Sequence, residues 1–172
     1  MPIYALGENE PRIDPQAYVQ PAAVIIGDVV IGPESTVWPC AVMRGDDGGI
    51  VVGARSSIQD GSIIHCLSNK PTIIGDDCTI GHNVHMEGCD IANKALIGSG
   101  SIVLPFAQIG EEAIVGANAV VTQGLVVPAR AMALGIPAKV REDSVEPGVT
   151  MLNADMYRER GHYYRENLRR LD

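Results

Sequence analysis

The chain has 172 residues, a formal net charge of −8 and only 4% aromatic residues. This length is most simply one domain that needs no disulfide bonds to bury a core, and acidic charge without a basic stripe argues against a nucleic-acid partner or an anionic membrane surface. No apolar run approaches the ~20 residues of a membrane helix, and the N-terminus lacks the basic and apolar regions of a signal peptide, so we expect a cytoplasmic protein.

A six-residue repeat of branched residues runs through most of the chain. Period six fits neither an amphipathic helix nor a plain alternating strand. It fits a β-solenoid in which three hexapeptides close one triangular coil and coils stack about 4.8 Å apart. The repeat breaks twice and slips once, and its inward positions are Ile13, Val19, Ile25, Ile31, Val37, Met43, Val52, Ile58, Ile64, Ile74, Ile80, Met86, Ile91, Ile97, Val103, Ile109, Val115, Val121 and Val127.

Both breaks in the repeat fall at equivalent places. Grouping the repeats three to a coil puts residues 44–51 (RGDDGGIV) and 65–73 (HCLSNKPTI) after the third strand of consecutive coils. They are therefore predicted to be loops that leave the solenoid at one corner, and loops carried on a rigid scaffold commonly frame a site.

The C-terminal part of the chain has a different pattern. We expect residues 1–140 to form the solenoid and residues 141–172 to form a helical segment packed on it. In this segment Leu152, Met156, Tyr163 and Leu168 form the predicted buried stripe, and Gly161 is predicted to be a weak point or bend.

Three polar residues share one row of the expected solenoid. Arg44, His65 and Glu87 each follow the inward residue of a third strand, so their side chains point outward on consecutive coils. Neighbours in such a row are about 5 Å apart, which puts His65 and Glu87 at the separation of metal ligands.

His82 is expected on a different face of its coil, directly above Asp60. It is poorly placed to join His65 and Glu87 of its own chain, but a neighbouring chain could supply it if solenoids pack about a threefold axis. His85 points outward on the same face as Glu87, so two ligand sets remain open. One is His65, Glu87 and a partner's His82, and in the other His85 joins or replaces one of these.

Three segments resemble the γ-class carbonic anhydrases and their carbonic-anhydrase-like relatives in the hexapeptide-repeat superfamily: residues 44–46 (RGD), 56–65 (SSIQDGSIIH) and 81–88 (GHNVHMEG). The resemblance implies an all-β solenoid, a left-handed parallel β-helix with a C-terminal α-helix. It also implies a homotrimer that binds zinc, or iron or cobalt, at its subunit interfaces. Metal-binding histidines of that family map onto His65 and onto His82 of the adjacent subunit. Positions that support the site or the interface map onto Arg44, Asp46, Gln59 and Asp60.

The match departs from the family at the metal site. Glu87 stands where the family has a third histidine, and residues 66–72 lack the carboxylate of the family's proton-shuttling loop. Two histidines with a carboxylate still form a zinc-binding set, although an anionic ligand raises the pKa of the bound water. The expected function is hydration of carbon dioxide to bicarbonate by a metal-bound hydroxide that Gln59 orients, with weak or redirected activity.

Two other functions stay open on the same residues. A hexapeptide-repeat acyltransferase would use a histidine as a general base without a metal. A non-enzymatic trimer would bind a metal or a siderophore, and the departures at the metal site favour it.

The four cysteines lack the paired spacing of a zinc ribbon or a redox motif, so we expect reduced, structural thiols. Cys78 takes a small-residue position of the repeat, and Cys66 and Cys89 are candidate soft ligands near the expected site.

Overall fold

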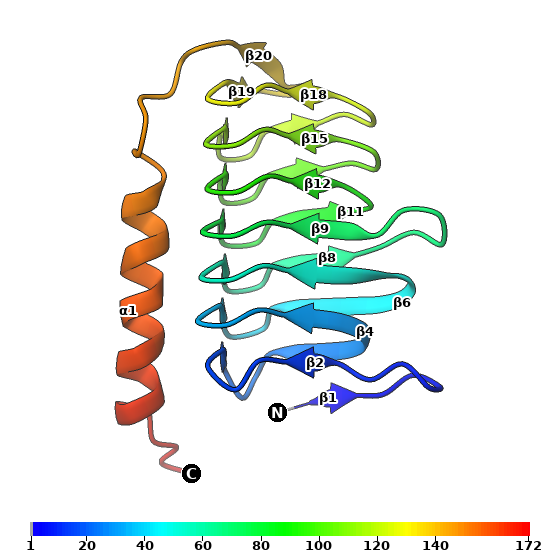
Figure 1. Cartoon of the computed structure of the whole chain (residues 1–172), viewed down its shortest axis with the longest axis vertical. Helices are drawn as coiled ribbons and strands as arrows, with labels where there is room; N and C mark the ends of the chain where they lie inside the picture. The colour runs from blue at the N-terminus through cyan, green and yellow to red at the C-terminus, as the bar shows by residue number, and fades with distance from the viewer. Residues whose placement is uncertain (1) are drawn as a thin grey trace.

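The structure is a computed structural model that describes residues 2–172. It is a β-solenoid of about seven turns with one α-helix lying along its side, as Figure 1 shows. Short strands stack in parallel register from coil to coil, and among the strands of residues 2–172 only the last is antiparallel to its neighbour. The fold class predicted from the six-residue repeat is confirmed.

The strands form three faces. The first face contains β2 (Arg12–Ile13), β9 (Thr72–Ile74), β12 (Asp90–Ile91), β15 (Gln108–Ile109) and β18 (Val126–Val127). The helix face, which α1 (Met151–Asn167) covers, contains β3 (Tyr18–Val19), β5 (Thr36–Val37), β7 (Ser57–Ile58), β10 (Thr79–Ile80), β13 (Leu96–Ile97), β16 (Ile114–Val115), β19 (Met132–Leu134) and β20 (Lys139–Arg141). The open face contains β1 (Ile3–Tyr4), β8 (Ile63–His65), β11 (His85–Glu87), β14 (Ile102–Val103) and β17 (Val120–Val121).

Two long strands join the open face to the first face. β4 (Val24–Ile31) and β6 (Val42–Val52) each run along the open face, turn the corner and continue on the first face, pairing with each other on both sides. Residues 44–51 are therefore not the predicted loop but the bent middle of β6. The backbones approach closely at this corner, where a Cβ on Gly45 would lie 2.3 Å from the Asp28 carbonyl oxygen. The second break, after β8, is a short loop closed by a bridge between Leu67 and Lys70.

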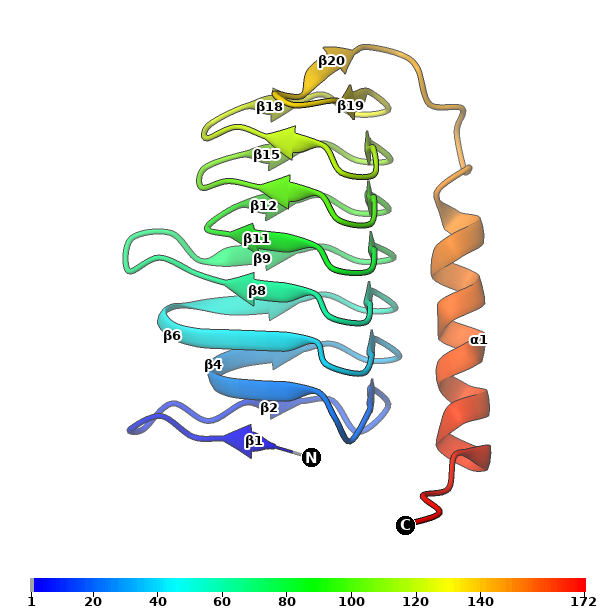
Figure 2. The same ribbon diagram turned by 180° about the vertical axis from the view of Figure 1, so that it is seen from behind.

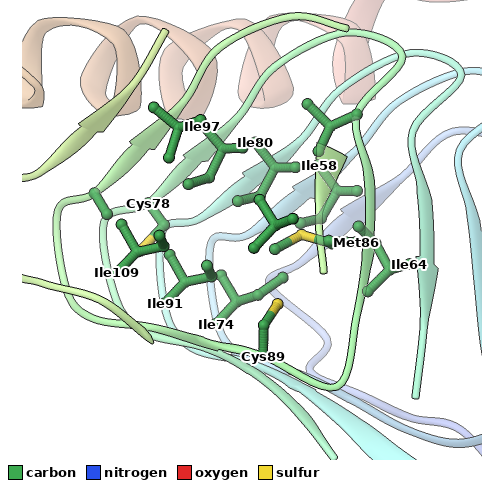
Figure 3. Close-up of a cluster of buried hydrophobic side chains, with 14 of the residues drawn as sticks. Ile58, Ile64, Ile74, Cys78, Ile80, Met86, Cys89, Ile91, Ile97 and Ile109 are labelled. Carbon is green, nitrogen blue, oxygen red and sulfur yellow. The ribbon is translucent and has the colours of Figure 1, made fainter. Parts of the chain in front are cut away.

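The repeat positions fill a narrow core between the three faces. Figure 3 shows Ile58, Ile80 and Ile97 from one face meeting Ile64, Met86 and their neighbours from the others, and each of these side chains is fully buried. Removing an isoleucine side chain from water is worth about 1.5–3 kcal/mol, so repetition over many coils supplies the driving force that the missing aromatic residues do not.

α1 runs antiparallel to the stacking direction of the coils, on the side of the solenoid away from the corner loops (Figures 1 and 2). The predicted buried stripe is wrong, because its members all face solvent: Leu152, Met156, Tyr163 and Leu168. The helix instead faces the solenoid with Ala154, Tyr157, Gly161 and Tyr164, a spacing of three and four that also keeps one side of a helix.

Aromatic side chains explain this choice of helix face. The Trp38 ring on the helix face lies 5.5 Å from the Tyr157 ring and 5.1 Å from the Tyr164 ring, centroid to centroid. Gly161 is not a bend, since the helix continues through it; a Cβ there would lie 2.6 Å from Thr36 Cγ2. Glycine thus allows the helix to approach the sheet closely enough for the rings to pack. No helix within residues 2–172 is long and apolar enough to cross a membrane.

Candidate functional site

The polar row on the open face lies where the repeat places it. Strands β6, β8 and β11 pair in parallel so that Arg44 is beside His65 and His65 is beside Glu87. On the same strands the other outward positions are Val42, Ile63 and His85.

His65 lies between two carboxylates. Its Nε2 is 2.8 Å from Asp46 Oδ1 and its Nδ1 is 3.2 Å from Glu87 Oε2, with the side chain 16% exposed. A neutral imidazole has a single N–H and can donate to only one of them. The lone pair of the other nitrogen then faces a carboxylate, and a cation bound between the two would remove this repulsion. A histidine with carboxylates is a donor set that zinc and iron accept, so these residues fit a divalent metal.

Asp46 is held in place from two directions. Its carboxylate also pairs with the Arg44 guanidinium. Burial would raise the pKa of Asp46, but the hydrogen bonds from His65 and Arg44 outweigh it and lower that pKa. Asp46 therefore stays ionised beside His65.

A buried thiol lies next to this pair. Cys66 Sγ accepts a hydrogen bond of 3.2 Å from the Gly48 backbone N–H. One ligand atom from each of Asp46, His65 and Cys66 lies within 4.8 Å of the other two. The sequence identifies Cys66 as a candidate soft ligand. It does not predict the contact of Asp46 with His65, because that contact depends on how β6 turns the corner.

His82 belongs to a second group of residues at the other edge of the open face. Its Nδ1 lies 2.9 Å from Asp60 Oδ2, the neighbour expected below it, and its Nε2 lies 3.3 Å from the Tyr157 hydroxyl on α1. Gln59 and Thr79, each only 4% exposed, line a cavity of about 230 Å³ together with these rings. Tyr157 was missed by sequence reasoning, since only the orientation of α1 reveals it.

The predicted site residues thus fall into two half-sites within one chain. The first half-site, at the corner between the open and first faces, contains Arg44, Asp46, His65 and Glu87. The second half-site, at the corner beside α1, contains Gln59, Asp60 and His82. His85 lies on the open face between them, with Ile63 and Ile102 as its neighbours on adjacent strands.

The other cysteines differ from Cys66 in their surroundings. All four thiols are free; Cys40 is exposed and Cys78 and Cys89 are buried. Burial raises the pKa of both Cys78 and Cys89 to about 12, which disfavours either as a thiolate ligand.

Comparison with known proteins agrees with this architecture. The family model described as "Bacterial transferase hexapeptide (six repeats)" matches residues 88–123. The carnitine operon protein CaiE of Proteus sp. is 40% identical over 139 residues, which are 81% of this chain and 71% of CaiE. The chain belongs to the hexapeptide-repeat family. The expected membership of its carbonic-anhydrase-like group, which contains the CaiE proteins, is confirmed, as is the left-handed β-helix.

Solved structures of this family share the whole fold. The product of the BC4754 gene of Bacillus cereus, named as a proposed acetyltransferase, is 37% identical with a TM-score of 0.93 over 96% of this chain and 98% of its own. A hexapeptide transferase family protein from Anaplasma phagocytophilum is 31% identical with a TM-score of 0.86 over 97% of this chain and 98% of its own. Members of the hexapeptide-repeat family typically form trimers.

Proposed function

We propose that this protein is a carbonic-anhydrase-like metalloprotein whose sites form between the subunits of a homotrimer. The observation that carries the proposal is His65 held between two carboxylates while His82 faces away at the other edge of the open face. Packing of open faces about a threefold axis would bring the second half-site of one chain to the first half-site of the next.

His65 and Glu87 of one chain and His82 of the partner subunit would hold the ion, which we expect to be zinc, iron or cobalt. Asp60 accepts the Nδ1–H of His82 and so leaves the Nε2 lone pair as the donor. The Tyr157 hydroxyl, which now contacts that nitrogen, would have to move aside. When bound, the metal would activate a water for attack on carbon dioxide.

The remaining predicted residues would position these groups. Asp46 accepts a hydrogen bond from His65 and fixes the orientation of the ring, while Arg44 balances the charge of Asp46. Gln59 is almost fully buried on the cavity beside His82, where its amide can orient a water or a small oxyanion such as bicarbonate. His85, on the apolar part of the open face, would contact the partner and be a ligand only if it replaced Glu87.

Metal analysis combined with stopped-flow hydration of carbon dioxide tests the proposal on the wild type and on Glu87→His. We expect bound divalent metal in both, and faster hydration in Glu87→His because a neutral ligand leaves the metal a stronger Lewis acid. A purified wild type that takes up no divalent metal would overturn the proposal. Bound metal without hydration in either protein would favour a metal- or siderophore-binding trimer.

A second candidate function rests on the pairing of His82 with Asp60 beside the 230 Å³ cavity. A histidine oriented by a carboxylate can remove a proton from a hydroxyl or an amine, as an acyltransferase requires. The proposed acetyltransferase from Bacillus cereus makes this candidate relevant. A thermal melt with acetyl-CoA distinguishes the two functions, since an acyltransferase is stabilised by its acyl donor and a carbonic-anhydrase-like protein is not.

A further inference from the structure

We infer that Cys66, Asp46 and His65 form a divalent metal position within a single chain, at the ring nitrogen of His65 that faces away from Glu87. The inference rests on the proposed function in taking His65 as a ligand, and it adds two donors that need no partner subunit. An unassembled chain could therefore take up a metal before the site between subunits exists.

The three donors are already close together. Asp46 Oδ1 is 2.8 Å from His65 Nε2, and the Cys66 thiol belongs to the same group within 4.8 Å. Donors on one zinc ion, at about 2.0–2.3 Å each, lie roughly 3.3–3.8 Å apart, so small side-chain movements suffice to close the group around an ion.

Backbone groups of β6 hold the thiol in place. Gly48 in β6 donates its N–H to Cys66 Sγ, and this approach needs glycine, because a Cβ on Gly48 would lie 2.0 Å from the Leu67 carbonyl oxygen. The Cys66 thiol in turn lies 3.7 Å from the Arg44 carbonyl oxygen, to which it donates. Binding would break the S–H bond, form the bond from sulfur to the metal and release the proton to solvent.

A metal at this position also gives Glu87 a role, as the acceptor of the remaining ring proton of His65. With a metal on Nε2, the single imidazole proton resides on Nδ1, where Glu87 Oε2 lies 3.2 Å away and accepts it. A carboxylate in this place fixes the tautomer of a metal-bound histidine. The two contacts of His65 are then satisfied without a second ring proton. Because a neutral imidazole has one lone pair, the single-chain position and the position between subunits are filled one at a time.

Cobalt(II) titration of His82→Ala tests the inference, since that variant lacks the donor that a partner would supply. We expect one cobalt per chain and a near-ultraviolet thiolate-to-cobalt charge-transfer band, both in His82→Ala and in the wild type at low metal. Adding Cys66→Ala should abolish the band and weaken cobalt binding by at least the roughly 10–100-fold that loss of an outer partner costs. Cys89→Ala is the matched control, because Cys89 is equally buried but lies outside the group, and its band should be unchanged.

The outcomes separate this inference from the proposed function. If cobalt binds the wild type without a thiolate band and does not bind His82→Ala, the inference is overturned and the proposed function is left intact. A band that survives Cys66→Ala would overturn it as well. Failure of the wild type to bind cobalt would contradict both. The wild-type spectrum reports on sulfur directly, so the test holds even if Cys66→Ala fails to fold.

Discussion

At the scale of single residues, His65 is the side chain on which the proposed chemistry of the open face depends. It is mostly buried, both of its ring nitrogens contact carboxylates, and a thiol lies in the same group. The two carboxylates can exchange roles. If Glu87 is a metal ligand, Asp46 accepts the ring proton of His65; if Asp46 is a ligand, Glu87 accepts that proton. Which nitrogen carries the proton therefore decides where a cation can bind.

Asp46 gives a prediction about pH. Burial would raise its pKa, but hydrogen bonds from His65 and Arg44 lower it below the unfolded value of about 3.9, so the ionised group stabilises the fold above that pH. We expect Asp46→Asn to reduce the free energy of unfolding by about 1 kcal/mol at pH 7. The difference should vanish as the pH falls through the folded pKa, where the wild-type carboxyl is also neutral. Urea unfolding at pH 7 and at the lowest pH at which the wild type stays folded measures this.

Asp47→Asn is the matched control for that measurement, because Asp47 is adjacent in sequence but exposed. It should change stability little at either pH. An Asp46→Asn defect of equal size at both pH values would mean that the charge of Asp46 contributes nothing.

Some of these residues could be placed from the sequence and others could not. The six-residue repeat fixes the register of the coils, so Glu87 beside His65 and Asp60 below His82 were both predicted. Asp46 was predicted to support the site, but its contact with His65 was not, because β6 turns the corner as a strand rather than as a loop. The site itself, including any ligand role of His82, Glu87 or His85, stays a prediction.

At the scale of elements, α1 shows where sequence periodicity is insufficient. Two stripes of the helix have helical spacing, and the more hydrophobic one faces solvent. Packing against Trp38 selects the other stripe, since tyrosine rings and a glycine fit that surface. A pattern within one helix does not reveal the shape of the sheet it covers.

Alanine substitutions distinguish the two stripes. The loss of stability should be large on the tyrosine stripe and small on the leucine stripe, the reverse of what the sequence predicts. We expect Tyr164→Ala to destabilise the fold by about 2–4 kcal/mol, because it removes a ring packed on Trp38. Leu152→Ala should change stability by less than about 0.5 kcal/mol in the isolated chain, since Leu152 is 75% exposed. Thermal melts of both variants decide between the stripes, and a larger loss in Leu152→Ala would contradict the observed orientation.

Gly161 provides a second test of the same element. In an isolated helix Gly161→Ala would add about 1 kcal/mol of stability, but here the new Cβ would lie 2.6 Å from Thr36 Cγ2. We expect a net loss of about 1–2 kcal/mol because the helix must move away from the sheet. Glu166→Ala, at an exposed helix position, should be nearly neutral in the same urea titration. A stabilised Gly161→Ala variant would show that the helix does not approach the sheet this closely.

At the scale of the whole molecule, the solenoid separates two groups of residues that the proposed chemistry needs together. The first half-site is at the corner away from α1 and the second is at the corner beside it (Figures 1 and 2). The open face between them is apolar at Val42, Ile63 and Ile102. A face of this kind is suited to contact with another copy of the chain, and members of the family typically form trimers.

Subunit complementation tests the central claim most directly. His65→Ala and His82→Ala chains each lack one half of every shared site, so either trimer alone should fail to hydrate carbon dioxide. When the two chains are unfolded, mixed in equal amounts and refolded together, about a quarter of the interfaces should combine an intact His65 with an intact His82. We predict that the mixture regains roughly that fraction of the wild-type hydration rate in stopped-flow measurements. An inactive mixture beside an active wild type, or full activity in either variant alone, would contradict a site shared between subunits.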